Sequence, residues 1–163
     1  MVDVYIGIGS NIEPSKNVQQ AMTLLARSFP AISFSRIFES ASVGFDGNNF
    51  LNLVAKFDTQ QTIDQVVDVL KQIEHKMGRI RGSKKFCDRR IDIDVLLYGD
   101  QIMSAPVEVP RGEILENAYV LWPLAELAPD LFHPGSDKNY HQLWQAFDKN
   151  SQQLTPVELD SHR

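Results

Sequence analysis

The sequence has a single cysteine, Cys87, and no apolar run that approaches the length of a membrane helix. One thiol cannot form an internal disulfide, which agrees with a reducing cytoplasm. A bilayer-spanning helix needs roughly 20 consecutive apolar residues, so no membrane partner is expected. The first residues, Met1–Tyr5, lack a basic segment, so no secretory signal is expected either. We therefore expect a cytoplasmic protein.

Internal repeats, low-complexity tracts and linkers are also missing from the 163 residues. A chain of this length, with 43% hydrophobic and 23% charged residues, is typical of one soluble globular domain. We expect that domain to span 1–163 and to be a monomer. The polar tail beyond about residue 150 is expected to be frayed and peripheral.

Positive charge is scarce except in one segment. The net charge is −5, which argues against a nucleic-acid partner bound by the surface at large. Residues 79–90 hold 6 of the 16 basic residues and only one acid, whereas the rest of the chain has 10 basic and 20 acidic residues. This concentration of cations predicts a local anionic ligand.

Two carboxylates follow this basic segment directly. In an extended strand, Asp92 and Asp94 share a face, at roughly 6.5–7 Å between their Cα atoms. The alternation predicts that Ile91, Ile93, Val95 and Leu97 share the opposite face. Magnesium prefers carboxylate, water and phosphate oxygens. The junction therefore predicts a site for a metal-bound phosphate.

Hydrophobic periodicity and capping signals predict four strands, two helices between them, and a helical C-terminal addition. The expected elements of the first half are a strand at 2–9, a helix from Ser15 as N-cap to Phe29, a strand through Ile32, Phe34 and Phe38, and a strand at 50–59. The second half is expected to contain a helix opened by a Thr62–Gln65 capping box and ended by Gly78, and a strand at 91–97. The C-terminal addition is expected to contain a short helix within 118–127, around Trp122-Pro123-Leu124 with Pro123 in its first turn, and helical turns from Tyr140 to Phe147. This order predicts a ferredoxin-like βαββαβ α+β fold, an antiparallel sheet with helices on one face. The open face is expected to carry the site.

Two features of the strands bear on a ligand. Phe50 and Asn52 share the face opposite the predicted core, where an aromatic ring and an amide suit a flat heterocycle. A covered Phe and a solvated Asn are the alternative. Gly7 and Gly9 either allow close approach of a ligand or neighbouring backbone, or only mark the end of their strand.

Glu74 lies inside the apolar stripe of its helix and near the helix C-terminus, where the dipole disfavours a carboxylate. These two costs suggest a task, such as binding a base or sugar or orienting Arg79 or Arg81. A stripe-edge glutamate paired with an arginine explains the pattern equally well.

Several motifs, in this order and spacing, resemble the 6-hydroxymethyl-7,8-dihydropterin pyrophosphokinase family of folate biosynthesis. They are Tyr5-Ile6-Gly7-Ile8-Gly9-Ser10-Asn11, Phe50-Leu51-Asn52, Ile73-Glu74, Gly78-Arg79-Ile80-Arg81, Arg89-x-x-Asp92-Ile93-Asp94 and Leu121-Trp122-Pro123-Leu124. The resemblance implies an enzyme that transfers pyrophosphate from ATP to the hydroxymethyl group of the pterin and releases AMP.

The resemblance also implies roles for particular residues. Asp92 and Asp94 would hold magnesium, two ions in this family, and Arg79 and Arg89 would brace the transferring group. The ATP-binding residues would be Lys71, Glu74, Arg81, Phe86, Val95 and Arg111. The pterin-binding residues would be Val43, Phe50, Asn52 and Tyr119.

The chain departs from the family pattern around the nucleotide. Phe86-Cys87-Asp88-Arg89 stands for Trp-Gly-Pro-Arg, Pro110-Arg111 for Pro-His, and Asn117 for an arginine two residues before the aromatic Tyr119. An altered or non-catalytic paralogue that binds a pterin is therefore an alternative. An RNA-binding module is more remote, because the strand at 50–59 lacks the stacking motif of such modules.

Overall fold

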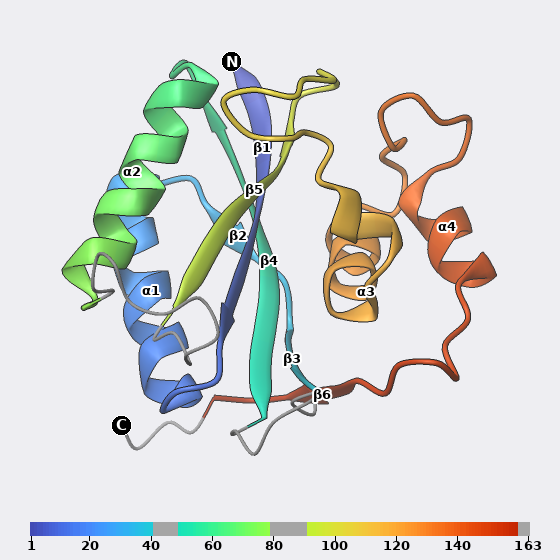
Figure 1. The fold of residues 1–163 in the computed structure, drawn as a ribbon, viewed down its shortest axis with the longest axis horizontal. Helices are drawn as coiled ribbons and strands as arrows, with labels where there is room; N and C mark the ends of the chain where they lie inside the picture. Colours follow the sequence, from blue (N-terminus) through green and yellow to red (C-terminus); the bar gives the residue numbers. More distant parts are fainter. Residues whose placement is uncertain (41–48, 79–90, 160–163) are drawn as a thin grey trace.

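The computed structural model describes residues 1–40, 49–78 and 91–159. Within these ranges the chain forms a six-stranded sheet with helices on either side (Figure 1). The strands are β1 (Val2–Ser10), β2 (Ser33–Phe34), β3 (Ile37–Ser40), β4 (Phe50–Thr59), β5 (Asp92–Tyr98) and β6 (Thr155–Val157). The helices are α1 (Pro14–Ser28), α2 (Ile63–Lys76), α3 (Ala118–Leu127), α4 (Tyr140–Ala146) and the 3-10 turn η1 (Gly112–Leu115).

The sheet has the strand order β5-β1-β4-β3-β6, and β2 also pairs with β4. The strand pairs are antiparallel. The element order and the sheet confirm the predicted ferredoxin-like arrangement, in which β1 and β4 are central and β5 is an edge strand. Among the described strands, β5 pairs on one side only, with β1.

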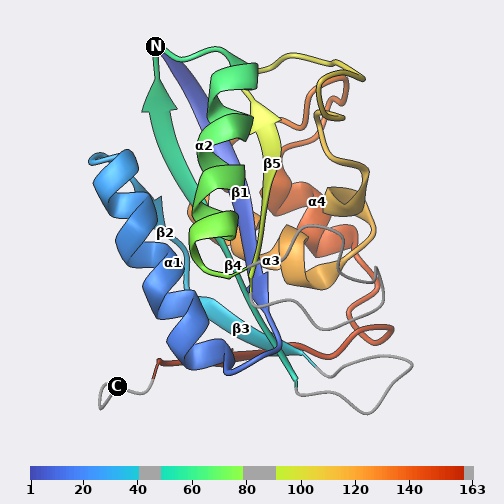
Figure 2. The ribbon, with the colours of Figure 1, turned by 60° about the vertical axis from the view of Figure 1, so that its left-hand side comes forward.

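Helices α1 and α2 lie side by side on one face of the sheet (Figures 1 and 2). The apolar face predicted for β4 is confirmed, because Leu51, Leu53, Ala55 and Phe57 are all in the core beneath these helices. The ring of Phe57 stacks on Phe29 at a centroid distance of 3.8 Å. The Thr62–Gln65 capping box is present at the start of α2, and Gly78 follows that helix with a positive φ of 95°.

Helices α3 and α4 pack on the opposite side of the sheet (Figure 1). Trp122 of α3 contacts Phe38 of β3 and stacks on Trp144 of α4 at 5.2 Å. The predicted place of Pro123 was wrong: α3 begins five residues earlier, at Ala118, so the proline lies inside the helix and not in its first turn. The C-terminal helices thus cover only part of the face that carries the pocket described below.

Alternation along β5 breaks at a bulge. Val95 pairs with Ile6, but Leu97 pairs with Tyr5, so β5 contains one extra residue at this point. Leu97 consequently packs with the α3 core, whereas Ile93 and Val95 pack beneath α2. The prediction that Leu97 shares their face was wrong.

Two smaller predictions also need correction. The strand predicted through Ile32, Phe34 and Phe38 is two strands, because Ser35 accepts the Val54 N–H with its hydroxyl and the register on β4 shifts. Helix α1 begins at Pro14, whose fixed φ suits the first helical position, with Glu13 rather than Ser15 at the N-cap.

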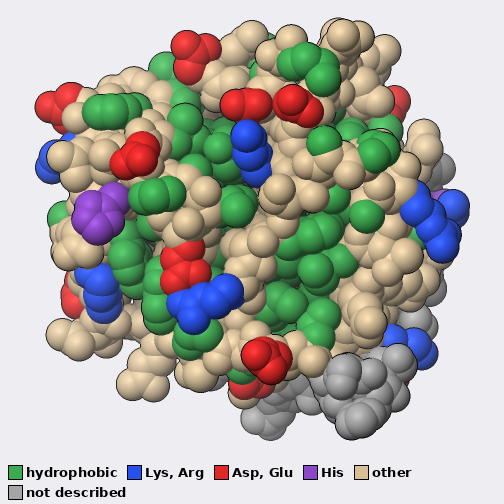
Figure 3. Space-filling view, turned by 180° about the vertical axis from the view of Figure 1, so that it is seen from behind, with side chains coloured by type: hydrophobic (Ala, Val, Ile, Leu, Met, Phe, Trp, Pro, Cys, Tyr) green, Lys and Arg blue, Asp and Glu red, His purple; other side chains and the backbone are tan. Residues whose placement is uncertain are grey.

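The prediction that the tail is frayed was wrong for its described part, residues 151–159. Thr155–Val157 forms β6, which pairs with β3 at the edge of the sheet. No helix among the described residues is long and apolar enough to cross a membrane. Seen from the rear, the described charges of both signs are interspersed around a central group of hydrophobic side chains (Figure 3).

Candidate active site

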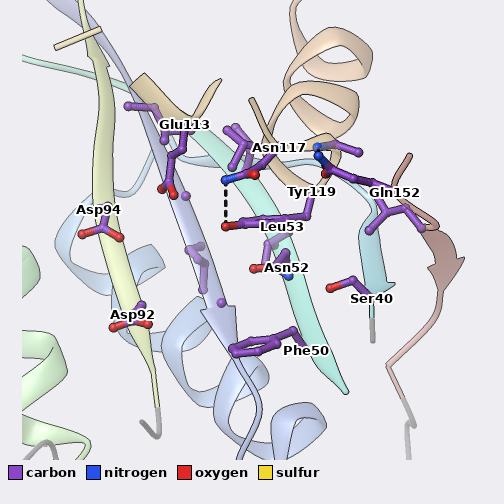
Figure 4. Close-up of a pocket in the computed structure, with 18 of the residues that line it drawn as sticks. Ser40, Phe50, Asn52, Leu53, Asp92, Asp94, Glu113, Asn117, Tyr119 and Gln152 are labelled. Atoms are coloured by element: carbon purple, nitrogen blue, oxygen red, sulfur yellow. Dashed lines mark hydrogen bonds between the residues drawn. The ribbon is translucent and has the colours of Figure 1, made fainter. Parts of the chain in front are cut away.

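A cavity of about 810 Å³ lies on the sheet face opposite α1 and α2. Its floor comes from β1, β4 and β5, and its other walls come from η1, the start of α3 and residues 151–154 of the tail (Figure 4). The cavity thus lies on the sheet face that was predicted to carry the site. Distant stretches of the sequence therefore meet around one space.

The floor of the cavity is bare in the middle because β1 contributes glycines there. Gly9 is flanked in register by Asn52 on β4 and Asp92 on β5, and Gly7 is flanked by Val54 and Asp94. Strands are about 4.8 Å apart, so Asn52 and Asp92 are about 10 Å apart across β1. A Cβ atom on Gly9 would lie 2.5 Å from Asn52 Oδ1. Gly9 therefore permits the close approach of the Asn52 side chain, a role that was not among those predicted for these glycines.

Asp92 and Asp94 project from β5 into one side of the cavity (Figure 4). The Asp94 side chain is 43% exposed, so water and a phosphate have access to its carboxylate. The predicted common face of the two aspartates is confirmed. Because magnesium is commonly held by one or two carboxylates plus water and phosphate oxygens, this donor set fits that metal.

Arg111 lies beside these carboxylates. Its Nη2 is 3.8 Å from Asp94 Oδ2, and its Nε donates to Glu113 Oε1 at 2.7 Å. Its backbone N–H donates to the carbonyl of Leu96, at the β5 bulge. The bulge thus fixes the start of the η1 segment against the edge strand. The guanidinium places a positive charge at the carboxylate end of the cavity.

Tyr119 and Asn117 form the wall opposite β4. Asn117 Nδ2 donates to Tyr119 Oη at 3.0 Å (Figure 4). Burial, followed by the nearby Glu113 carboxylate, raises the pKa of Tyr119 to about 12. The phenol therefore stays protonated at neutral pH and is able to donate to an acceptor.

Phe50 and Asn52 lie at the side of the cavity away from β5, with Ser40 beyond them (Figure 4). The ring of Phe50 is partly exposed, whereas Asn52 is only 9% exposed. This combination offers a stacking surface beside a confined amide. Its distance from the aspartates separates the cavity into an aromatic–amide end and a carboxylate end.

Three predicted ATP-binding residues do not line the cavity. Lys71 is on the exposed side of α2, and Val95 is 4% exposed with its side chain in the core beneath that helix. Glu74 is 5% exposed, and its Oε2 accepts the Ile93 N–H at 2.7 Å. This bond ties α2 to the strand that carries the aspartates. It gives Glu74 a structural task that its helix pattern did not reveal.

Five other predicted residues lie outside the described ranges. They are Val43, Arg79, Arg81, Phe86 and Arg89.

A family model described as 7,8-dihydro-6-hydroxymethylpterin-pyrophosphokinase matches residues 5–129. The chain belongs to this family. The match begins in β1 and ends just after α3, so it includes both aspartates, both floor glycines and the aromatic–amide end. The family consists of pyrophosphokinases, and the chain is assigned to this class of enzyme.

Individual relatives agree with the family assignment. A 2-amino-4-hydroxy-6-hydroxymethyldihydropteridine pyrophosphokinase of Pseudomonas aeruginosa is 36% identical over 136 residues, which are 80% of this chain and 83% of that protein. The enzyme with the same name in Aquifex aeolicus is 31% identical over 137 residues, 82% of this chain and 85% of that protein. A folic acid synthesis protein of Schizosaccharomyces pombe is 32% identical over 89% of this chain and 20% of its own length.

Solved structures agree on the fold. A crystal structure of HPPK-DHPS in complex with substrates superposes with a TM-score of 0.69 at 10% identity, over 92% of this chain and 44% of that one. Wild-type HPPK-DHPS of Plasmodium falciparum with SDX-DHP gives a TM-score of 0.67 at 12% identity, over 89% of this chain and 43% of that one. At these identities the likeness establishes the fold alone, and this chain spans less than half of each.

Two features of the cavity were not predicted from the sequence. Glu113 holds Arg111, and its only signal is a carboxylate two residues after a cation. Residues 151–154 form a wall, although a polar tail gives no sign of a distant contact. The family match ends at residue 129, so these tail residues lie beyond it.

Proposed function

We propose that this protein transfers pyrophosphate from magnesium-bound ATP to the hydroxymethyl group of 6-hydroxymethyl-7,8-dihydropterin, with AMP as the second product, in folate biosynthesis. One observation carries the proposal: a carboxylate pair and an aromatic–amide pair lie at two sides of one cavity, separated by a glycine floor. A phosphate donor and a flat acceptor are thereby offered adjacent sites. The relatives' names supply the pterin and the family supplies the transferred group.

At the carboxylate end, Asp92 and Asp94 would hold magnesium, which we expect to number two ions. When bound, the metal would neutralise phosphate charge and orient the transferring group. Arg111 adds a cation beside Asp94, held by Glu113. Arg79 and Arg89 are proposed to brace the same group. Positioning and charge neutralisation are what phosphoryl-type transfer chiefly requires.

At the aromatic–amide end, Phe50 would stack on the pterin and Asn52 would bind its polar edge. Tyr119 would close the site with a phenol that remains protonated, and Val43 is proposed to contact the same ligand. An amide matches a heterocycle that presents donors and acceptors side by side, because it offers one of each. The 9% exposure of Asn52 makes this match selective, since a mismatched ligand would leave a confined polar group without its partner.

The part of ATP beyond its phosphates is proposed to extend out of the cavity past the edge strand β5. Glu74 and Lys71 belong to the helix packed on the other side of that strand, and with Arg81, Phe86 and Val95 they would contact the nucleotide. Because the Val95 side chain is in the core, its contact would come from the backbone. The nucleotide assignment is thus most direct for Arg111, whose side chain reaches the cavity.

The proposed reaction occurs between the ligands bound at the two ends of the cavity. The hydroxymethyl oxygen attacks the β-phosphorus of ATP, the bond from that phosphorus to the α,β-bridging oxygen breaks, and AMP departs while the hydroxyl proton passes to solvent water. Holding acceptor and donor in line converts an encounter of two molecules into a step within one complex. The residues named above bind, orient and neutralise, and none of them forms a covalent intermediate.

A coupled assay tests the function. Purified protein is incubated with ATP, Mg²⁺ and hydroxymethyl-dihydropterin, and AMP, ADP and pterin pyrophosphate are quantified. We expect one AMP per pterin consumed, no ADP, and loss of turnover when the metal is chelated. Folded protein that forms no AMP contradicts the proposal. Pterin binding without AMP would instead identify the non-catalytic paralogue.

A further inference from the structure

The tail residues Ser151–Leu154, here called the C-terminal strap, form the cavity wall nearest the aromatic–amide end. In Figure 4, Gln152 lies beside Asn117 and Tyr119, on the far side of Asn52 from the two aspartates. The strap lies beyond the part of the chain that matches the family model. The family match therefore assigns it no role.

One side chain joins the strap to α3. Gln152 Oε1 accepts the N–H of Ala118 at 2.7 Å, and Gln152 Nε2 donates to the carbonyl of Glu116 at 2.8 Å. A single amide therefore satisfies one backbone group on each side of Asn117. Both bonds are lost together if this side chain is removed.

These bonds explain why the Asn117 side chain does not cap α3. Asn117 is the N-cap residue of α3, a position whose side chain usually accepts a bond from the first helical turn. Here its side chain makes no cap bond and its Nδ2 donates to the Tyr119 hydroxyl instead. Gln152 supplies an acceptor for the first N–H of the helix from a distant segment. The Asn117 amide is thereby available to orient Tyr119.

The strap is anchored at its two ends as well. At its start, the Ser151 hydroxyl and N–H both donate to the carbonyl of Asp148 and close a local turn. After it, Thr155 begins β6, which pairs with β3 beside the cavity. Between the turn and β6, the two Gln152 bonds join the strap to the start of α3.

We propose that Gln152 is a positioning residue for the pterin site: it clamps the C-terminal strap to the N-terminus of α3 and thereby holds Tyr119 against the pterin. This inference rests on the proposed function. It assigns Gln152 to the acceptor substrate and not to ATP, because Arg111 and the aspartates are at the other end of the cavity.

The test compares Gln152→Ala, Gln152→Glu and the control Gln145→Ala, which changes an exposed glutamine on α4. Isothermal titration measures the dissociation constant of hydroxymethyl-dihydropterin, and steady-state kinetics separate the pterin KM from the ATP KM and kcat. Amide hydrogen exchange of residues 116–121 and 151–157 reports whether the strap is released.

For Gln152→Ala we expect faster exchange in both segments and a pterin dissociation constant raised about tenfold, with the ATP KM and kcat changed less than about twofold. Gln152→Glu should be intermediate, because its carboxylate still accepts the Ala118 N–H but cannot donate to Glu116. Gln152→Glu also tests the role of Gln152 if the alanine variant does not fold. Gln145→Ala should match the wild type.

Unchanged pterin affinity in a Gln152 variant whose strap is released would overturn the inference while leaving the proposed function intact. So would a loss confined to ATP. Wild-type protein that neither binds the pterin nor forms AMP would overturn the proposed function, and this inference with it.

Discussion

On the helix-covered face of the sheet, β1 presents Val4, Ile6 and Ile8 to a closed apolar core, whereas on the other face it presents Gly7 and Gly9 to the cavity. The neighbouring strands repeat this division. On β4, Leu51 and Leu53 enter the core and Asn52 faces the cavity, and on β5 the isoleucine and valine side chains oppose the aspartates.

The difference shows that alternation along three strands separates stability from chemistry. The core face gains free energy by removing apolar surface from water, at about 25 cal/mol per Å². The cavity face buries less apolar surface, because it has glycines and polar side chains at these positions. These residues leave space for a ligand and provide oxygen atoms that can bind it. Substitutions on the two faces should therefore change different measurements.

The largest expected effect is on the cavity face, at Asp94. Asp94→Ala removes a proposed magnesium ligand, so kcat should fall about a thousandfold, or about 4 kcal/mol of transition-state stabilisation. Pterin affinity should change little, because the metals serve the phosphates. Rapid-quench measurement of AMP gives kcat, and titration gives the pterin affinity. The control is Asp68→Ala, which changes an exposed residue of α2. Near wild-type turnover would show that the metal assignment is wrong.

The next effect is on the helix-covered face, at Glu74. Glu74→Ala removes the acceptor of the Ile93 N–H and should lower the free energy of unfolding by about 1–3 kcal/mol. Glu74→Gln keeps an oxygen at that place and should lose less. Urea denaturation measures the stability of both.

The glutamine variant also tests the proposed nucleotide contact of Glu74. A raised ATP KM in Glu74→Gln, with stability preserved, would support that contact. Equal stability of the alanine variant and the wild type would contradict the structural task.

A smaller effect is expected on the cavity face, at Gly9. In Gly9→Ala the new Cβ would lie 2.5 Å from Asn52 Oδ1 and must displace that amide, so the pterin dissociation constant should rise about tenfold. Gly7→Ala is a matched control, because its Cβ would be 3.4 Å from the Leu96 side chain, an ordinary contact. Calorimetric titration of both variants checks the contrast. A larger loss in Gly7→Ala would contradict the assignment of Asn52.

The smallest expected effect lies outside both faces, at His133. This ring is 8% exposed and contacts the Tyr140 hydroxyl at 2.7 Å, and burial lowers its pKa from the usual 6.5. The unfolded state therefore takes up a proton first as the pH falls below about 6.5, and stability declines there.

In His133→Gln this part of the pH dependence should vanish, whereas exposed His141→Gln should retain it. Unfolding free energies between pH 7.5 and 5 measure the difference. A His133→Gln curve parallel to that of the wild type would rule out this source of acid sensitivity.

The fold was predictable because its main signals are local. Period-two patterns located β4 and β5, and the Thr62–Gln65 box located the start of α2. The errors arose where a distant partner decides the outcome. The β5 bulge depends on pairing with β1, and the split of β2 from β3 depends on the bond between Ser35 and Val54.

The site was predictable only where chemistry follows strand alternation. Asp92 with Asp94, and Phe50 with Asn52, could be assigned to one face each from their spacing. Gln152 could not, because its two partners are more than 30 residues away and it belongs to a polar tail. The buried role of Glu74 was missed for a related reason: helix geometry places the carboxylate but does not name the N–H that it accepts.

The most direct test of the central claim is whether both ends of the cavity are filled at once. Pterin is titrated into the wild-type protein with and without a saturating magnesium complex of an ATP analogue that carries a methylene group in place of the α,β-bridging oxygen, the bond that the reaction breaks. We predict one bound pterin per chain in both titrations, with affinity undiminished by the analogue. Loss of pterin binding in proportion to bound analogue would mean that the two ligands compete for one site, and would contradict the account.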